Sequence, residues 1–214
     1  MMQRLVDTIV AALVLALLTP IFVLVSLVIV LRSPGNPFYG GWRIGKDGTR
    51  FRMWKFRTMV IGADRMGGSI APSGDPRITR VGRFLRATKI DELPQFFNLL
   101  SGDLTLVGPR PEDPAIVEHY TAEQLQTLKV KPGITGPGQI YYTTDQVGSI
   151  PEGVSADQYY LEHLLEKKLR LDLDYLRLRT PLSDCRVVWQ TIVLVARALA
   201  GVVRANPRTE KAHS

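Results

Sequence analysis

Two adjacent carboxylates, Asp91 and Glu92, are the side chains of this sequence best placed to do chemistry. Apolar residues recur at helical spacing after them, so we expect the pair at a helix N-terminus, where free backbone amides and the helix dipole stabilise negative charge. Alone, this arrangement is an ordinary helix cap. A catalytic role becomes the stronger hypothesis where cationic side chains gather around the same two residues.

Arg110 is the most distinctive nearby cation, because it lies between Pro109 and Pro111. A guanidinium group presents a rigid fork that matches phosphate oxygens, and a proline on each side restricts the backbone. Arg110 is therefore a candidate phosphate clamp, with a rigid surface turn as the alternative explanation. Three further cations belong to the same neighbourhood: Lys55, Arg57 and Arg86.

The composition narrows the function classes. The 214 residues carry a formal net charge of +7, which indicates an anionic partner such as phosphates, an acidic lipid surface or nucleic acid. The single cysteine, Cys185, excludes an internal disulfide and a cysteine zinc site. No groove-reading motif accompanies the positive charge, so nucleic acid is not the expected partner. The three histidines lie far apart, without the spacing of metal ligands: His119, His163 and His213.

The N-terminal segment is apolar enough to enter a membrane. Ile9 to Leu31 contains 23 residues without a charge, and a straight helix of that length covers roughly 34 Å. Thr19-Pro20 lies at its middle, where proline removes a backbone hydrogen bond and a threonine hydroxyl can satisfy a freed carbonyl, so a kink is expected there. A straight span and a re-entrant helix both stay open, because the N-terminal flank carries only Arg4 and Asp7. The positive-inside bias places the following basic residues in the cytoplasm: Arg32, Arg43 and Lys46.

The next segments must position the carboxylates and cations. Two alternating segments, Phe38 to Ile44 and Phe51 to Met59, flank Asp47-Gly48 and predict a β-hairpin. Gly62 to Pro76 is rich in Gly, Ser, Pro and Asp, and we interpret it as a mobile loop, with an idle linker as the alternative. Thr79 can cap a short helix whose mixture of apolar and arginine side chains suits a headgroup layer or an ordinary solvated face.

Further elements are predicted downstream. A helix begins at Asp91, tolerates Pro94 in its first turn and ends at Gly102. Residues 104–107 predict a short buried strand. Leucines at helical spacing predict a core helix from about residue 156 to residue 179. The segment 182–205 carries one polar stripe on an apolar helix, which suits both a helix lying on a membrane and a helix facing the core.

Four motifs occur in order: Lys55-Phe56-Arg57-Thr58-Met59, Arg80 to Arg86, Asp91-Glu92-Leu93-Pro94-Gln95 and Gly108-Pro109-Arg110-Pro111-Glu112. None is decisive alone, but their joint order strongly resembles the bacterial sugar transferases, the monotopic phosphoglycosyl transferases. The resemblance is close over residues 1–136 and loose beyond. Lys131 to Gly136 also resembles a family segment. Pro137-Gly138-Gln139 departs from the family pattern, so nucleotide and sugar contacts from that region stay open.

The resemblance implies a mostly α fold with a small β element. A re-entrant N-terminal membrane helix, broken at Thr19 and Pro20, and amphipathic interfacial helices would support a compact catalytic domain on the cytoplasmic face of the bacterial inner membrane. The chain is expected to be the minimal form, without the extra N-terminal transmembrane bundle of larger relatives. The expected divisions are residues 1–35 for the membrane helix, 36–180 for the catalytic domain, 181–205 for an amphipathic helix and 206–214 for a disordered tail.

The resemblance also implies a reaction. A sugar phosphate would move from a nucleotide-diphosphate sugar, expected to be a UDP-sugar, to polyprenyl phosphate, with release of nucleoside monophosphate. This would be the first membrane step of glycoconjugate or exopolysaccharide assembly. Asp91 would be the nucleophile of a covalent phosphosugar intermediate, and Glu92, together with Asp91, would bind Mg²⁺. The substrate phosphates would contact Lys55, Arg57, Arg86 and Arg110.

Two alternatives stay open at this point. In direct transfer, Asp91 and Glu92 only bind magnesium, and the lipid phosphate attacks the nucleotide sugar in a ternary complex. In a non-catalytic role, the basic chain binds acidic lipids or scaffolds a glycan-assembly complex. The expected partners are the nucleotide sugar, polyprenyl phosphate and inner-membrane lipids, with a homodimer as an option and nucleic acid excluded.

Overall fold

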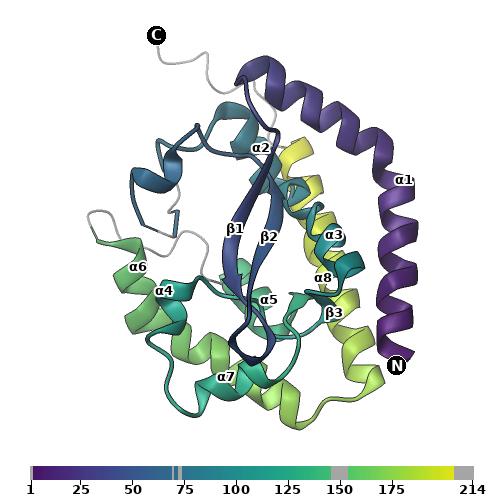
Figure 1. Cartoon of the computed structure of the whole chain (residues 1–214), viewed down its shortest axis with the longest axis vertical. Coiled ribbons are helices and arrows are strands. Elements are labelled where there is room, and N and C mark those ends of the chain that lie inside the picture. Colours follow the sequence, from purple (N-terminus) through teal and green to yellow (C-terminus); the bar gives the residue numbers. More distant parts are fainter. Residues whose placement is uncertain (1, 69, 72–73, 146–153, 205–214) are drawn as a thin grey trace.

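Helices dominate the chain, and two small sheets lie among them (Figure 1). A computed structural model describes residues 2–68, 70–71, 74–145 and 154–204, so the predicted disordered tail at 206–214 lies outside the described residues. The predicted mostly helical fold with a small β element is confirmed. The helices are α1 (Met2–Arg32), α2 (Arg80–Ala87), α3 (Gln95–Ser101), α4 (Pro114–Val117), α5 (Pro137–Asp145), α6 (Ala156–Tyr159), α7 (Leu165–Arg177) and α8 (Pro181–Arg204). The strands are β1 (Phe38–Ile44), β2 (Arg50–Phe56), β3 (Thr105–Val107) and β4 (Gly133–Thr135), and the short turns are η1 (Lys46–Gly48), η2 (Ala63–Arg65), η3 (Ile90–Glu92), η4 (Gln124–Lys129) and the π-helical η5 (Tyr160–Leu164).

Helix α1 continues through Pro20 and changes direction along its length in Figure 1. The hydroxyl of Thr19 donates a hydrogen bond to the carbonyl of Leu15 at 2.8 Å. A proline removes one helical hydrogen bond and a back-bonding threonine bends a helix, so both residues suit this shape. Among the described residues, α1 is the one helix that is long and apolar enough to cross a membrane, by length and composition.

Phenylalanine side chains join α1 to the rest of the fold. Phe22 packs on Phe56 with ring centroids 5.2 Å apart and on Phe97 at 5.5 Å. Phe38 stacks on Phe56 at 5.3 Å, and Leu85 of α2 completes the buried cluster. Such aromatic pairs contribute about 0.5–1.5 kcal/mol each beyond the burial of their area. Helix α1 is therefore a packed part of the fold rather than a detachable anchor.

The predicted hairpin is confirmed as β1 and β2, which pair antiparallel along their full length. Its turn holds Asp47 and Gly48 at positive φ values of 54° and 78°. Asp and Gly tolerate this left-handed region better than most residues, which explains their place at the turn. Strand β2 ends at Phe56, before its predicted end, because Met59 leaves the ladder and forms an isolated bridge with Ile78.

The prediction that a helix begins at Asp91 is wrong in detail. Asp91 and Glu92 lie in the 3₁₀ turn η3, and α3 begins only at Gln95. Lys89, just before the turn, adopts a left-handed conformation with φ of 61°. Pro94, which has no backbone amide to donate, separates the turn from the helix as the N-cap of α3. The two carboxylates therefore lie on a tight turn in front of the helix.

The remaining elements follow the sequence pattern in part. Strand β3 confirms the short strand predicted at 104–107, but the pattern does not predict its parallel partner β4, since three residues are too few to show alternation. The helix predicted at 156–179 is divided into α6, η5 and α7. Helix α8 confirms the helix predicted at 182–205.

Candidate active site

A cleft of about 1230 Å³ brings the predicted charged residues together. Its lining comes from the hairpin, the segment 57–78, α2, η3 and the turn after β3, together with side chains of α7 and the turn before it. Basic lining residues outnumber acidic ones by nine to five, so the cleft suits a polyanion. All six predicted catalytic and phosphate-binding residues line it: Lys55, Arg57, Arg86, Asp91, Glu92 and Arg110.

Glu92 holds two of these cations. Its Oε1 accepts hydrogen bonds from Lys55 Nζ at 2.9 Å and from Arg110 Nη2 at 2.6 Å, and its Oε2 accepts one from Arg110 Nη1 at 3.3 Å. Burial alone would raise the pKa of Glu92, but the charges of Arg110 and Lys55 outweigh burial and hold this pKa well below its usual value. Glu92 is therefore ionised, and it fixes an ammonium and a guanidinium group beside Asp91.

Asp91 is a buried carboxylate without a hydrogen-bond partner. It is 5% exposed, its Oδ1 is enclosed, and neither of its oxygens accepts a hydrogen bond from the part of the chain that the structure describes. Burial raises the pKa of Asp91, while the positive charge of Lys55 opposes the shift. Its lone pairs are therefore available to an electrophilic phosphorus or to a cation.

Two further cations approach Asp91 from the preceding residues. Lys89 adopts the left-handed conformation, which costs on the order of 1–3 kcal/mol for such a residue and is concentrated at functional sites. Arg86 Nε donates a hydrogen bond to Thr58 Oγ1 at 2.9 Å. An added Cβ on Gly82 would lie 1.9 Å from the Thr58 carbonyl oxygen, so glycine lets α2 approach closely enough for this contact.

Arg57 also lines the cleft, but its guanidinium group is engaged by backbone. It donates to the carbonyl of Ser33 and, at 3.5 Å, to that of Pro34. Arg57 thus joins the exit of α1 to the end of the hairpin. The predicted helix-break residues, Thr19 and Pro20, do not line the charged cleft and lie on α1.

Sequence analysis missed a second charged group in the same cleft. Glu112 Oε1 accepts hydrogen bonds from Tyr160 Oη at 2.5 Å and from Nζ of Lys168, a residue only 2% exposed. Burial alone would raise the pKa of Glu112, but the charge of Lys168 and the hydrogen bonds from Lys168 and Tyr160 together outweigh burial, so this pKa lies below its usual value. The sequence does contain a signal for this charged group, because Lys168 and Asp172 follow Leu165 by three and seven residues. They therefore share the leucine-bearing face, where a charge needs a buried partner.

Asp172 fastens α7 to α5 behind this group. Its Oδ1 accepts a hydrogen bond from the backbone amide of Gly138 at 2.9 Å, while its Oδ2 has no partner within the described ranges. An added Cβ on Gly138 would lie 2.6 Å from Oδ2, so this contact depends on glycine. Burial raises the pKa of Asp172 to about 6, with Lys168 opposing the shift.

Asp172→Asn is expected to gain stability relative to wild type between about pH 4 and pH 7. The folded-state pKa of Asp172 lies above its unfolded value, so the folded chain binds more protons in this window and wild-type stability falls as pH rises. A shift of about two pKa units corresponds to about 3 kcal/mol. Urea unfolding in detergent at a series of pH values measures the difference. Asp174→Asn, at an exposed position, is the control, and parallel pH curves for wild type and Asp172→Asn would contradict the prediction.

The two adjacent carboxylates fit a divalent cation that is shared with substrate phosphates. Mg²⁺ is usually held by one or two carboxylates together with phosphate oxygens and waters. Asp91 Oδ1 has no hydrogen-bond partner among the described residues, and Glu92 Oε2 accepts the 3.3 Å hydrogen bond from Arg110. The described residues contain no group of three His, Cys, Asp or Glu side chains that could hold a metal ion. Substrate phosphate oxygens and waters would supply the remaining ligands.

An apolar groove of about 720 Å³ adjoins the charged cleft. One side of α1 supplies most of its lining, including Thr19, and Phe97 of α3 contributes as well. Phe38 lines both the groove and the charged cleft, so the two surfaces meet at this side chain. Together they fit a molecule with an anionic head and an apolar tail.

Comparison with known proteins gives a consistent result. The family model described as bacterial sugar transferase matches residues 1–198. The chain is 36% identical over 195 residues to a UDP-glucose:undecaprenyl-phosphate glucose-1-phosphate transferase of Escherichia coli, covering 90% of this chain and 39% of the relative. It is 36% identical over 193 residues to a Caulobacter vibrioides protein of the same name, covering 89% of this chain and 68% of the relative. A putative undecaprenyl-phosphate N-acetylgalactosaminyl 1-phosphate transferase of Bacillus subtilis is 43% identical over 121 residues, covering 56% of this chain and 68% of the relative. The chain thus spans about two fifths of the Escherichia coli relative and about two thirds of the other two.

Proposed function

This chain belongs to the bacterial sugar transferase family, and from that premise we propose that it transfers a sugar phosphate from a UDP-sugar to a polyprenyl phosphate such as undecaprenyl phosphate. The observation that carries the proposal is the buried, unpaired Asp91 beside Glu92, whose carboxylate holds Lys55 and Arg110. The cleft thus offers an available anionic oxygen next to two fixed cations, as transfer of a phosphoryl group requires. The product would enter glycoconjugate or exopolysaccharide assembly at its first membrane step.

In the first step, a carboxylate oxygen of Asp91 attacks the sugar-bearing phosphorus of the UDP-sugar. A bond forms between that oxygen and phosphorus, the bond from phosphorus to the bridging oxygen breaks, and UMP leaves with the electron pair. Arg110 and Lys55 support the negative charge that develops on the phosphoryl oxygens. Glu92 keeps these two cations beside Asp91 before the donor arrives.

In the second step, an oxygen of polyprenyl phosphate attacks the same phosphorus. The bond between phosphorus and Asp91 breaks, which restores the carboxylate and yields a polyprenyl diphosphate sugar. The attacking phosphate is already ionised near neutral pH, so a strong general base is unnecessary. The lining of the charged cleft supports this view, because its described residues include no histidine.

The proposal includes Mg²⁺, held by Asp91 and Glu92 together with oxygens of the donor diphosphate. When bound, the cation would neutralise part of the diphosphate charge. Asp91 and Glu92 would then divide their tasks: Asp91 attacks phosphorus, and Glu92 keeps metal and cations in place. Arg86 stands near enough to the same cleft to serve as a further phosphate contact.

The apolar groove supports a lipid acceptor. A polyprenyl tail is apolar, and the groove is lined mainly by α1, the helix that is suited to a membrane. Because the groove meets the charged cleft at Phe38, a lipid phosphate inside the cleft can keep its tail along α1. The phosphate of the acceptor would therefore reach Asp91 while its tail stays in apolar surroundings.

Both ends of α1 contact the body that holds the charged cleft, which supports a re-entrant helix with its two ends on the same face of the membrane. By the positive-inside bias, the basic residues after α1 support the cytoplasmic face of the inner membrane. At the start of α1, Asp7 is 4% exposed and accepts a hydrogen bond from Thr105 Oγ1 at 2.8 Å. At its end, the carbonyl of Ser33 accepts a hydrogen bond from Arg57. A helix that crosses the bilayer has its ends on opposite faces of a hydrocarbon layer roughly 30 Å thick, where one small body does not reach both.

Gln3→Cys and Lys46→Cys are expected to be labelled from the same, cytoplasmic side of sealed membrane vesicles. Both positions are exposed, and the exposed Cys185 is first replaced by serine. A membrane-impermeant maleimide is applied to inside-out and right-side-out vesicles. The re-entrant helix predicts that both sites react only in inside-out vesicles. Labelling of the two sites from opposite sides would show a spanning helix instead.

The activity itself is tested with the purified protein, a panel of UDP-sugars, Mg²⁺ and undecaprenyl phosphate. We expect UMP release with at least one donor and formation of a lipid-linked diphosphate sugar. UMP released before the acceptor is added, up to one equivalent per chain, supports the covalent route, whereas release only with the acceptor indicates direct transfer. If the protein binds acidic vesicles but releases UMP from no donor, the proposed enzymatic function is wrong and a non-catalytic membrane scaffold is favoured.

A further inference from the structure

We propose that the first two turns of α1 form a bracket that positions the active site, with Asp7 as its central positioning residue. This α1 bracket consists of Gln3, Arg4 and Asp7. It holds β3 and the C-terminal end of α3 at the same time. These two elements lead directly to the phosphate clamp and to the two carboxylates. The inference rests on the proposed function and adds to it a role for the polar start of an otherwise apolar helix.

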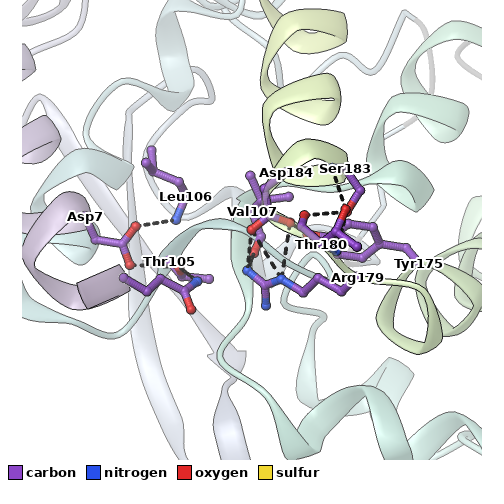
Figure 2. Close-up of polar contacts among 10 residues, drawn as sticks. Asp7, Thr105, Leu106, Val107, Tyr175, Arg179, Thr180, Ser183 and Asp184 are labelled. Atoms are coloured by element: carbon purple, nitrogen blue, oxygen red, sulfur yellow. Dashed lines mark hydrogen bonds and ion pairs between the residues drawn. The ribbon is translucent and has the colours of Figure 1, made fainter. Parts of the chain in front are cut away.

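The first arm of the bracket reaches β3. Asp7 Oδ2 accepts a hydrogen bond from Thr105 Oγ1 at 2.8 Å, and Asp7 Oδ1 accepts one from the backbone amide of Leu106 at 3.2 Å. Gln3 Nε2 donates to the same Thr105 hydroxyl at 2.8 Å. In Figure 2, Asp7 approaches Thr105 and Leu106 from one side, and Arg179 lies on the other side of the strand. Asp7 therefore fixes both a side chain and the backbone of β3.

The opposite side of β3 is held by Arg179, which lies just before α8 and is itself bound by Asp184 of that helix. Arg179 Nη2 donates to the carbonyl of Val107 at 3.2 Å and to Asp184 Oδ2 at 2.9 Å. Tyr175 also donates to Asp184, so the guanidinium group is itself held in place. Strand β3 is thus gripped between α1 and the start of α8. Loss of the Asp7 contacts would weaken the hold on β3 from the α1 side, where the hydrogen bond from Gln3 to Thr105 would remain.

Little freedom separates β3 from the phosphate clamp. Gly108 follows the strand and donates its amide to the carbonyl of Thr135, and the carbonyl of Pro109 accepts from Gly133, both at 2.9 Å. Proline fixes the backbone next to Arg110, whose fork binds Glu92. A shift of β3 is therefore carried into the position of the Arg110 guanidinium group.

The second arm of the bracket reaches α3. Arg4 Nη1 donates to the carbonyl of Leu99 and Arg4 Nη2 to that of Leu100, each at 2.7 Å. The last carbonyls of a helix lack intrahelical partners, and a cation there also complements the helix dipole. Helix α3 is seven residues long, and the turn with Asp91 and Glu92 lies directly before it. One end of α3 is thus held by Arg4 while the other supports the carboxylates.

Asp7 is buried, so it needs hydrogen bonds that compensate for the loss of water. An ionised carboxylate inside a protein or at a membrane surface is unfavourable unless hydrogen bonds compensate it, and apolar side chains occupy most of α1. Both hydrogen bonds that Asp7 accepts from the described residues come from β3. The hydrogen bonds that stabilise the buried Asp7 are therefore the same ones that hold the strand leading to Arg110.

Asp7→Asn is expected to lower kcat about tenfold, because a displacement of an active-site group by a fraction of an ångström is enough for such a loss. The KM for the UDP-sugar should change less than twofold, and membrane association should persist. Thr105→Val removes the hydroxyl from the same contact and should act in the same direction, whereas Thr105→Ser keeps it and should stay near wild type. Asp174→Asn, an exposed change of the same kind, is the control.

A double-mutant cycle separates positioning from general destabilisation. If Asp7 acts through the clamp, Asp7→Asn should have little further effect on kcat in an Arg110→Lys background. A full tenfold loss in that background would overturn the proposal, as would normal kcat in both Asp7→Asn and Thr105→Val. An inactive wild type would instead count against the proposed function.

Hydrogen exchange tests the bracket without relying on activity. Asp7→Asn should speed exchange of the Leu106 and Gly108 amides. The NH2 group that replaces Oδ2 cannot accept from Thr105 Oγ1, and the neutral amide oxygen is a weaker acceptor for Leu106, so the strand and the Gly108 that follows it are held less firmly. Exchange in the β1–β2 hairpin should remain as in wild type. Unchanged exchange at Leu106 and Gly108 would contradict the proposed role of the α1 bracket, even if turnover fell. Where Asp7→Asn folds poorly, the Thr105→Val and Thr105→Ser pair gives the same comparison with a smaller change.

Discussion

Asp91→Asn is expected to lower sugar-phosphate transfer by about 10³-fold or more, because a neutral amide cannot supply the attacking anion. The fold should survive. Burial raises the pKa of Asp91, so the buried position disfavours the charge and accepts the neutral amide at no loss of stability. The thermal midpoint of Asp91→Asn should therefore equal or exceed that of wild type. Coupled UMP release and thermal unfolding in detergent measure the two quantities on one preparation.

The covalent role of Asp91 has a direct readout. Wild-type protein incubated with a UDP-sugar and Mg²⁺, but without acceptor, should gain the mass of a phosphosugar, and peptide mapping should place it on Asp91. Asp91→Asn should gain nothing, and Asp47→Asn, on the exposed hairpin turn, should behave as wild type. An active enzyme that never carries the adduct would leave Asp91 as a metal ligand and favour direct transfer.

Arg110→Lys is expected to lower kcat about 10- to 100-fold, although the positive charge is kept. In the structure, two guanidinium nitrogens of Arg110 bind the two oxygens of Glu92. A lysine ammonium is a point charge, so it can neutralise Glu92 but cannot present two parallel donors to a carboxylate or a phosphate. Steady-state kinetics with the preferred UDP-sugar measure the loss, and flotation with liposomes checks that membrane association is unchanged.

A matched surface change controls for the substitution itself. Arg177 is exposed and pairs with Glu123, so Arg177→Lys should leave kcat within twofold of wild type. Near-normal turnover in Arg110→Lys would mean that Arg110 only stiffens its turn. In that case the phosphate would rely on Lys55, which Glu92 holds in the cleft, and on Arg86.

Local signals predict the elements of this fold well. The turn residues Asp47 and Gly48 predict the hairpin, and Thr79 caps α2 through a 2.9 Å hydrogen bond from the amide of Gly82. The exact start of α3 was not predictable in the same way. It depends on the left-handed Lys89, a conformation that lysine has no intrinsic preference for and that the surrounding contacts impose.

The predicted site depended on recognising the order of its motifs. Lys55 and Arg110 are 55 positions apart, and no periodicity shows that both meet Glu92. Glu112 belongs to one of these motifs, but the sequence predicts no role for it, because its partner Lys168 lies in a leucine-rich helix whose pattern indicates core packing. A charged residue on an apolar helix face, such as Lys168, indicates a buried polar contact. The partner in that contact is determined by tertiary packing and cannot be identified from the sequence pattern.

Asp7 shows the same limit. In the sequence it is a flanking charge that helps little with membrane orientation. In the structure it is buried against β3 and connected to the segment before Arg110. The two roles cannot be told apart without knowing that a strand nearly a hundred residues later lies beside it.

In the proposed reaction, the meeting of the charged cleft and the apolar groove at Phe38 would affect how the two substrates are supplied. The nucleotide sugar diffuses through water in three dimensions, whereas the lipid acceptor diffuses in the plane of the membrane. The first step then follows a bulk concentration, and the second follows a surface density. Adding inert lipid at a fixed amount of acceptor would dilute the second substrate alone. Such an enzyme responds to the crowding of its lipid carrier, and a cell that depletes free carrier would slow this step with the nucleotide sugar still abundant.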